Sequence, residues 1–93
     1  MIRSFRDRAT EAVFRGERAR EFSTQIAKSA RRKLLMLHYA ARLDDLRMPP
    51  ANRLEALKGN RAGQHSIRIN DQYRLCFRWT PLGPEQVEIT DYH

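Results

Sequence analysis

The residues of this 93-residue chain that are best suited to chemistry are the three that end it, Asp91-Tyr92-His93. A carboxylate, a phenol and an imidazole supply groups that accept or release a proton. Metal-free RNA cleavage needs such groups, because a base takes the proton of the 2′-hydroxyl and an acid protonates the leaving 5′-oxygen. A terminal histidine is more often a surface residue than a catalytic one, so the assignment needs support from the rest of the chain.

The same reaction needs positive charge to stabilise its phosphorane intermediate. Arg74 is the most constrained candidate, because a guanidinium on a strand can contact a phosphate through two N–H groups and cannot readily act as a base. The alternative is an exposed strand charge paired with Glu88 or Asp91. The full set of candidate cations is Lys58, Arg61, Arg68 and Arg74.

Metal chemistry has little support in the sequence. His38, His65 and His93 are scattered, and no pair of them has the spacing of metal ligands on a helix. No glycine-rich phosphate loop or nucleophile elbow is present. Cys76 is the single cysteine, and its place within a strand pattern indicates a structural residue rather than a nucleophile. We expect no metal and no other cofactor.

Two helices are predicted ahead of the strands that carry these groups. The first runs from about Arg8 to Arg15 with Asp7 as its N-cap. The second begins near Ser23 or Thr24 and is long and amphipathic. The segment 16–23 between them has no clear period, so we expect a mobile or short helical connector there. The apolar positions of the second helix are Ile26, Ala30, Leu34, Leu37 and Ala41.

The architecture changes at Met48-Pro49-Pro50, because proline ends helical structure. Four short segments rich in β-formers follow and are joined by short turns, which predicts an antiparallel meander. An early strand over Ile2–Phe5 could join its edge. We therefore expect one α+β domain over residues 1–93, with the helices on one face of the sheet. The predicted strands are 54–58, 65–69, 73–79 and 86–91.

Alternation along these strands assigns the two faces of the sheet. One face is apolar and meets the helices. The other is polar and exposed, which makes it the natural place for a functional site. The residues assigned to this open face are Ser66, Arg68, Asn70, Arg74, Cys76, Arg78, Glu88, Thr90 and Tyr92.

The charge of the chain points to a polyanionic partner. It carries 18 Lys and Arg against 11 Asp and Glu, a formal charge of +7, which favours nucleic acid or a ribosome surface, although many basic surfaces only aid solubility. All of the excess lies before residue 54. No segment reads as a signal peptide or a membrane span. We expect a cytoplasmic protein with no membrane partner.

Several blocks of sequence together resemble the HigB-type toxins of bacterial toxin-antitoxin systems, within the RelE superfamily. Any one block alone would be a weak match, but they occur in the family's order and cover nearly the whole chain. The blocks are 1–5 (MIRSF), 57–63 (LKGNRAG), 64–70 (QHSIRIN), 73–77 (YRLCF) and the closing Asp91-Tyr92-His93.

The resemblance implies a RelE-like fold and cleavage of messenger RNA in the A site of the 30S ribosomal subunit. It also implies a HigA-type helix-turn-helix antitoxin, through which the toxin reaches operator DNA indirectly, and contacts between the basic N-terminal half and ribosomal RNA. By resemblance, Lys58 and Arg61 contact phosphate, Arg74 stabilises the transition state, and the terminal acid-base group is Asp91, Tyr92 and His93. The complete prediction counts Lys58 among the catalytic residues and adds Glu55, Arg68 and Asn70 to Arg61 as RNA or phosphate contacts.

The resemblance leaves the general base open. Some family members have a histidine where this chain has Glu55, so Glu55, His93 or Asp91 could take the proton, or positioning by the ribosome could dominate. Two other functions remain as alternatives. One is a toxin of the same superfold that poisons DNA gyrase, and the other is a non-catalytic RNA-binding module.

Overall fold

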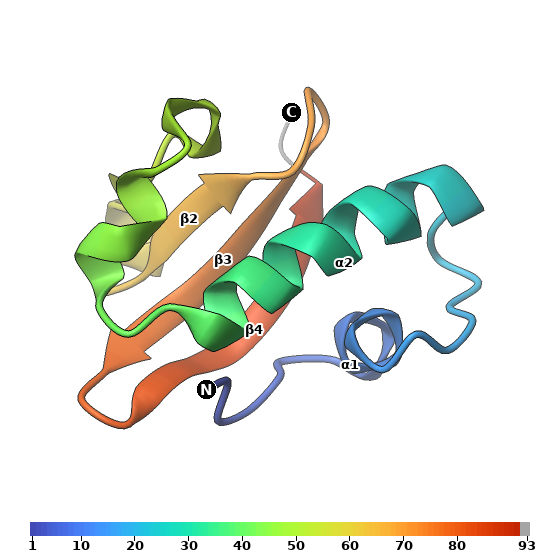
Figure 1. Cartoon of the computed structure of the whole chain (residues 1–93), viewed down its shortest axis with the longest axis horizontal. Helices are drawn as coiled ribbons and strands as arrows, with labels where there is room; N and C mark the ends of the chain where they lie inside the picture. Colours follow the sequence, from blue (N-terminus) through green and yellow to red (C-terminus); the bar gives the residue numbers. More distant parts are fainter. Residues whose placement is uncertain (92–93) are drawn as a thin grey trace.

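Helix α2, Thr24–Tyr39, lies across one face of a four-stranded antiparallel sheet. A computed structural model describes residues 1–91 of the chain. Helix α1, Arg8–Phe14, packs beside α2 near strand β4, and the open face of the sheet lies behind both helices in Figure 1. This is the α+β architecture that the sequence predicts, with both helices on one face.

The helix caps follow from side chains at the predicted positions. Asp7 Oδ1 accepts a hydrogen bond from Thr10 N–H at 2.7 Å, and Ser23 Oγ accepts one from Ile26 N–H at 3.2 Å. The connector 16–23 contains no helix of its own. Ala41 was expected on the inner face of the second helix, but it is exposed because α2 ends at Tyr39.

The strands form a simple meander in the order β1-β2-β3-β4. Strand β1 is shorter than predicted, because the chain turns through a left-handed residue at Arg53 just before it and enters a 3-10 helix, η3, Gly59–Arg61, just after it. Strand β4 begins at Gly83, earlier than predicted, so the hairpin turn is only Pro81-Leu82. The strands are β1 Glu55–Ala56, β2 His65–Arg68, β3 Tyr73–Thr80 and β4 Gly83–Asp91.

The N-terminal segment does run along the sheet edge, but the predicted strand over Ile2–Phe5 is reduced to one parallel bridge between Phe5 and Val87. The backbone of β4 is irregular at this point, because Gln86 has a φ of 53°. A regular ladder therefore does not form. The backbone groups of Val87 at this edge still have hydrogen-bond partners. Arg6 N–H donates to Val87 O at 2.9 Å, and Val87 N–H donates to Ser4 O at 3.1 Å.

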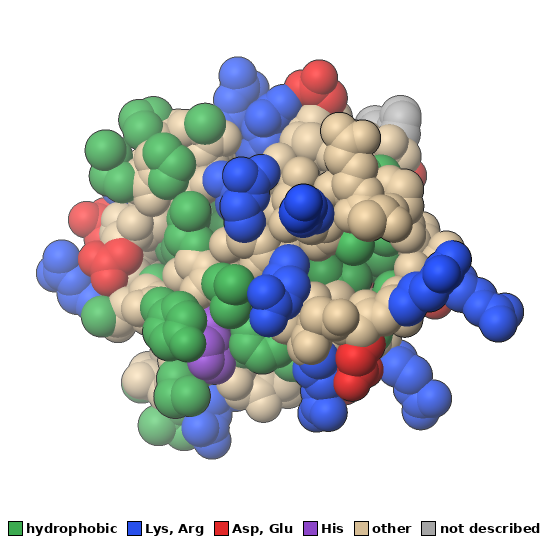
Figure 2. Space-filling view, turned by 45° about the vertical axis from the view of Figure 1, so that its right-hand side comes forward, with side chains coloured by type: hydrophobic (Ala, Val, Ile, Leu, Met, Phe, Trp, Pro, Cys, Tyr) green, Lys and Arg blue, Asp and Glu red, His purple; other side chains and the backbone are tan. Residues whose placement is uncertain are grey.

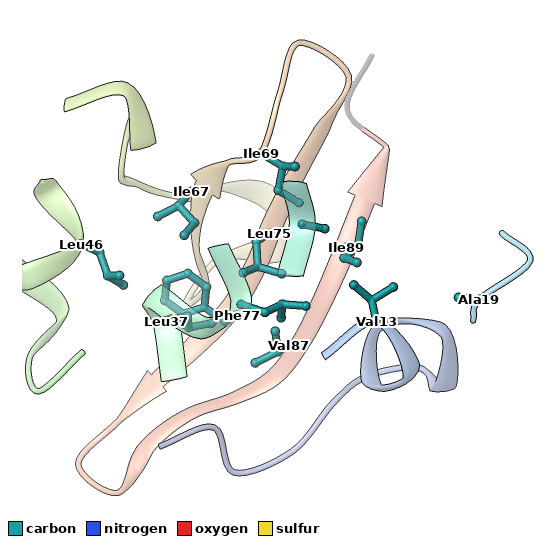
Figure 3. Packing of buried hydrophobic residues seen from close by; sticks show 12 residues of the cluster. Val13, Ala19, Leu37, Leu46, Ile67, Ile69, Leu75, Phe77, Val87 and Ile89 are labelled. Atoms are coloured by element: carbon teal, nitrogen blue, oxygen red, sulfur yellow. The ribbon is translucent and has the colours of Figure 1, made fainter. Parts of the chain in front are cut away.

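The core lies between α2 and the apolar face of the sheet (Figure 3). Leu34 and Leu37 from α2 meet Leu75 and Phe77 from β3, and all four are fully buried. Thr10 is a buried polar residue of α1, and its Oγ1 accepts a hydrogen bond from Ile89 N–H at 3.0 Å. Alternate residues of β3 consequently point away from the core and onto the open face.

His38 joins the end of α2 to the N-terminus and makes stability depend on pH. Its Nδ1 accepts a hydrogen bond from Ile2 N–H at 3.1 Å. Burial lowers the pKa of His38, and the positive N-terminus lowers it further. The unfolded chain therefore binds a proton more readily than the folded one. The contribution of His38 to the free energy of unfolding is complete above the pKa of the unfolded chain, about 6.5. It is lost as the pH falls below that pKa.

We expect the free energy of unfolding of the parent chain to fall more between about pH 7.5 and about pH 5.5 than that of His38→Gln, which cannot titrate. Urea unfolding at both pH values measures this, and other titrating groups cancel in the difference between the two proteins. Equal decreases for parent and variant would contradict the role given to His38.

Candidate functional site

The open face of the sheet is organised in two rows of side chains across the strands. Pairing in register places Glu55, Ser66, Cys76 and Glu88 in one row, which crosses all four strands. The next row contains Arg68, Arg74 and Thr90. Residues directly opposite each other in an antiparallel sheet share a face, so the face assignments made from alternation hold for Ser66, Arg68, Arg74, Cys76, Glu88 and Thr90. Glu55, which alternation left unassigned, joins them through its pairing with Ser66.

Arg74 lies near the middle of the open face, between its neighbours Arg68 on β2 and Thr90 on β4. Its side chain is only 13% exposed. Nη2 of Arg74 donates a hydrogen bond to the Arg53 carbonyl oxygen at 2.8 Å and lies 3.5 Å from Glu55 Oε1. The ion pair with Glu55 joins two residues predicted for the site, and it was not among the pairings considered from the sequence.

A second group of charges lies where η3 meets the open face. Arg61 Nη1 lies 3.1 Å from Gln64 Oε1 and 3.3 Å from Glu88 Oε1. Arg6 Nε approaches the same Glu88 oxygen at 4.0 Å. Glu88 therefore lies between two arginines, one from the N-terminal segment and one from η3. Neither Arg6 nor the role of Glu88 was predicted, because only the parallel bridge at Phe5 brings Arg6 to this edge.

Arg78 extends this group of cations over the turn after η3. A Cβ atom on Gly63 would lie 3.0 Å from Arg78 Nη1, and Gly63 has a φ of 92°. The left-handed backbone favours glycine here, and the guanidinium at the end of the flexible Arg78 side chain lies close against it. Lys58 lies at the other end of the same turn, where its carbonyl accepts from Arg61 N–H at 3.2 Å, and its side chain is exposed.

The remaining predicted residues lie at the end of the sheet where β2 turns into β3. Arg68 pairs with Asp71. Asn70 Oδ1 accepts hydrogen bonds from Gln72 N–H at 2.9 Å and from Tyr73 N–H at 2.7 Å, so that oxygen shapes the turn. Asp91 Oδ2 accepts one from Gln72 Nε2 at 3.1 Å. These contacts bring Asp91 next to the β2–β3 turn (Figure 1).

The remaining residues with a thiol, imidazole or phenol that bear on the site are Cys76, His65, Tyr92 and His93. Burial raises the pKa of the Cys76 thiol, so the thiol is protonated at neutral pH and inert, as predicted. His65 lies opposite Phe77 in the β2–β3 ladder and stacks on its ring, so it belongs to the core side. Tyr92 and His93, both predicted to be catalytic, lie outside the described residues.

Basic side chains also cover the helical side of the molecule. Figure 2 shows Lys and Arg side chains spread across this view, with hydrophobic side chains between them. Lys28, Arg31 and Arg32 of α2 are all exposed. Arg31 also has a structural role, because its Nε donates to the Phe14 carbonyl oxygen at the end of α1 at 3.1 Å. These three cations of α2 therefore lie on the helical side of the molecule, on the opposite side of the sheet from the open face.

Two features bear on metals and membranes. Over residues 1–91, no three His, Cys, Asp or Glu side chains come together in a group that could hold a metal ion. No helix in this part of the chain is long and apolar enough to cross a membrane.

Comparison with known proteins gives consistent matches. A family model described as the RelE-like toxin of type II toxin-antitoxin system HigB matches residues 3–93. Toxin HigB-1 of Vibrio cholerae serotype O1 is 42% identical over 80 residues, which cover 85% of this chain and 84% of that protein. An uncharacterized protein of Haemophilus influenzae is 38% identical over 64 residues, which cover 69% of this chain and 63% of that protein.

Proposed function

The chain belongs to the RelE-like HigB family of toxins of type II toxin-antitoxin systems, and from this membership we propose that it is a ribosome-dependent endoribonuclease that cuts messenger RNA in the A site. The observation that carries the proposal is Arg74, a mostly buried guanidinium fixed on the open face of the sheet. A preorganised cation of this kind stabilises charge that develops on a phosphate.

The proposed reaction uses three kinds of group. Arg74 stabilises the negative charge of the phosphorane, and Lys58 and Arg61 contact the flanking phosphates. Arg68, Asn70 and Glu55 complete the RNA contacts. The terminal residues Asp91, Tyr92 and His93 position the nucleotide and assist proton transfer.

The proposal has two candidate positions for the general base. Glu55 carries a carboxylate 3.5 Å from Arg74 and is half exposed, so a 2′-hydroxyl can reach it beside the stabilising cation. His93 or Asp91 offers the second position, from the end of β4. No residue of the described chain is assigned a metal-dependent step, and the reaction needs no cofactor.

The partners follow from the same premise. A type II system supplies an antitoxin protein, and we propose that it is a HigA-type helix-turn-helix protein that also binds the operator DNA. The exposed cations of α2, Lys28, Arg31 and Arg32, suit the phosphates of ribosomal RNA, which would hold the open face against the A site in the cytoplasm.

The gyrase-poisoning alternative and the RNA-binding alternative make different predictions in cells. We expect brief expression of the parent chain to create new RNA ends within translated reading frames, and these ends to disappear when initiation of translation is blocked. Arg74→Ala and His93→Ala should create fewer of them. DNA breaks without new RNA ends would indicate a gyrase poison, and neither kind of break would indicate a binding module.

A further inference from the structure

The guanidinium of Arg74 is held by the main chain as well as by a carboxylate. Nη2 donates to the Arg53 carbonyl oxygen at 2.8 Å, which is shorter than its 3.5 Å separation from Glu55 Oε1. The Glu55 side chain is 52% exposed and can rotate into solvent. A backbone carbonyl has no such freedom. The orientation of Arg74 therefore depends on the conformation of Arg53.

Arg53 adopts a conformation that a residue with a side chain rarely takes. Its φ is 47° and its ψ is 54°, in the left-handed region. Such a residue persists only where the surrounding structure holds it, and left-handed residues of this kind are concentrated at functional sites. Arg53 N–H donates to the Pro50 carbonyl oxygen at 3.0 Å, which closes the 3-10 helix η2, Pro50–Asn52.

The residue that holds this turn is Asn52, whose side chain is completely buried. Its Nδ2 lies 3.1 Å from the Leu46 carbonyl oxygen and 3.4 Å from the Met48 carbonyl oxygen. Its Oδ1 accepts a hydrogen bond from Lys33 Nζ of α2. Buried amides are costly unless they are satisfied, so these partners fix the end of η2 against α2 and against the 3-10 helix η1, Leu43–Arg47.

We propose that Asn52 and Arg53 are positioning residues for RNA cleavage: Asn52 holds Arg53 in its left-handed conformation, and the Arg53 carbonyl oxygen then aims the guanidinium of Arg74. The inference rests on the proposed ribonuclease function. In this proposal Arg53 acts through its backbone carbonyl. The type of side chain at position 53 matters only because it determines whether the backbone can adopt the left-handed conformation.

A matched pair of variants separates this backbone effect from the charge of Arg53. Arg53→Asn and Arg53→Val both remove the positive charge, but asparagine tolerates the left-handed region and a β-branched valine does not. A milder pair of the same kind is Arg53→Gly with Arg53→Ala, should the valine variant not fold. Circular dichroism and thermal melting of each protein identify the temperature at which all of them are folded.

The first readout is single-turnover cleavage of messenger RNA on programmed ribosomes at that temperature. We expect Arg53→Val to have a maximal cleavage rate about 10- to 100-fold below that of Arg53→Asn, because small misplacements of a catalytic group have effects of this size. The ribosome concentration for half-maximal rate should be the same for the two variants. Equal maximal rates would overturn the inference.

The second readout does not depend on cleavage. The side-chain ¹⁵N–¹H resonances of Arg74, assigned by their loss in Arg74→Ala, report its surroundings directly. We expect Arg53→Asn to keep the parental resonances, and Arg53→Val and Asn52→Asp to shift or broaden them. Asn52→Asp replaces the donating amide nitrogen by an oxygen, so it loses the contacts with Leu46 and Met48.

The two readouts together identify which statement fails. A lower cleavage rate in Arg53→Val with unchanged Arg74 resonances would overturn the inference, since the effect would then bypass Arg74. Unchanged resonances in Asn52→Asp would remove Asn52 from it. A parent chain that does not cut ribosome-bound messenger RNA would instead refute the proposed function. The Arg74 resonances would still test whether the conformation of Arg53 controls the orientation of Arg74.

Discussion

Arg74→Ala is expected to lower the rate of messenger RNA cleavage on the ribosome by about 10²–10³-fold, the usual effect of removing one preorganised group that stabilises transition-state charge. The guanidinium is mostly buried on the open face and has a fixed orientation. The neighbouring cation in the same row, Arg68, is paired with Asp71. Water can fill the space but cannot supply the positive charge.

The measurement is the single-turnover rate with saturating ribosomes, beside two further variants. Arg74→Lys keeps the charge but loses the bidentate fork, so its rate should lie between those of the parent and the alanine variant. Arg15→Ala removes an equal charge from an exposed ion pair with Glu11 on α1. A folded Arg74→Ala protein that cuts as fast as Arg15→Ala would show that the reaction does not use Arg74.

Phe77→Ala should come close to unfolding the protein. Phe77 is a fully buried residue of the core between α2 and the sheet, and removing such a ring costs about 3–5 kcal/mol through lost burial and the cavity left behind. Small domains have only about 5–15 kcal/mol of stability in total. The same strand carries Arg74, so the site should be lost together with the fold.

Urea unfolding of Phe77→Ala tests this expectation. The variant and its control both carry Arg74→Ala, so that toxicity does not limit expression. Leu82→Ala is the matched control, because Leu82 is 72% exposed at the tip of the β3–β4 turn. Its free energy of unfolding should change by no more than about 0.5 kcal/mol. Similar unfolding midpoints for the two variants would contradict the packing described for the core.

The features that sequence alone could predict are those encoded by local periodicity. Alternation in β3 correctly separates Leu75 and Phe77 from Arg74 and Cys76, because strand side chains point to opposite faces with a period of two. The long helix and the cap at Ser23 follow equally from spacing and capping chemistry. These two rules suffice to place Arg74 on the open face.

The features that sequence could not predict depend on contacts between distant segments or on single backbone angles. Arg6 reaches Glu88 only because the N-terminal segment runs beside β4. One partner of Arg74 is a carbonyl group 21 residues away, which no side-chain pattern encodes. Asn52 looks like an ordinary turn residue after two prolines, and its burial appears only once α2 and η1 close around it.

The most direct test of the proposed function is a purified cleavage reaction with one messenger RNA in two states, free in solution and bound to ribosomes with an empty A site. The proposal predicts that the parent chain cuts the ribosome-bound RNA within the A-site codon, leaves the free RNA intact, and leaves a 2′,3′-cyclic or 3′-phosphate end. Equal cutting of both RNAs, or none of either, would contradict it.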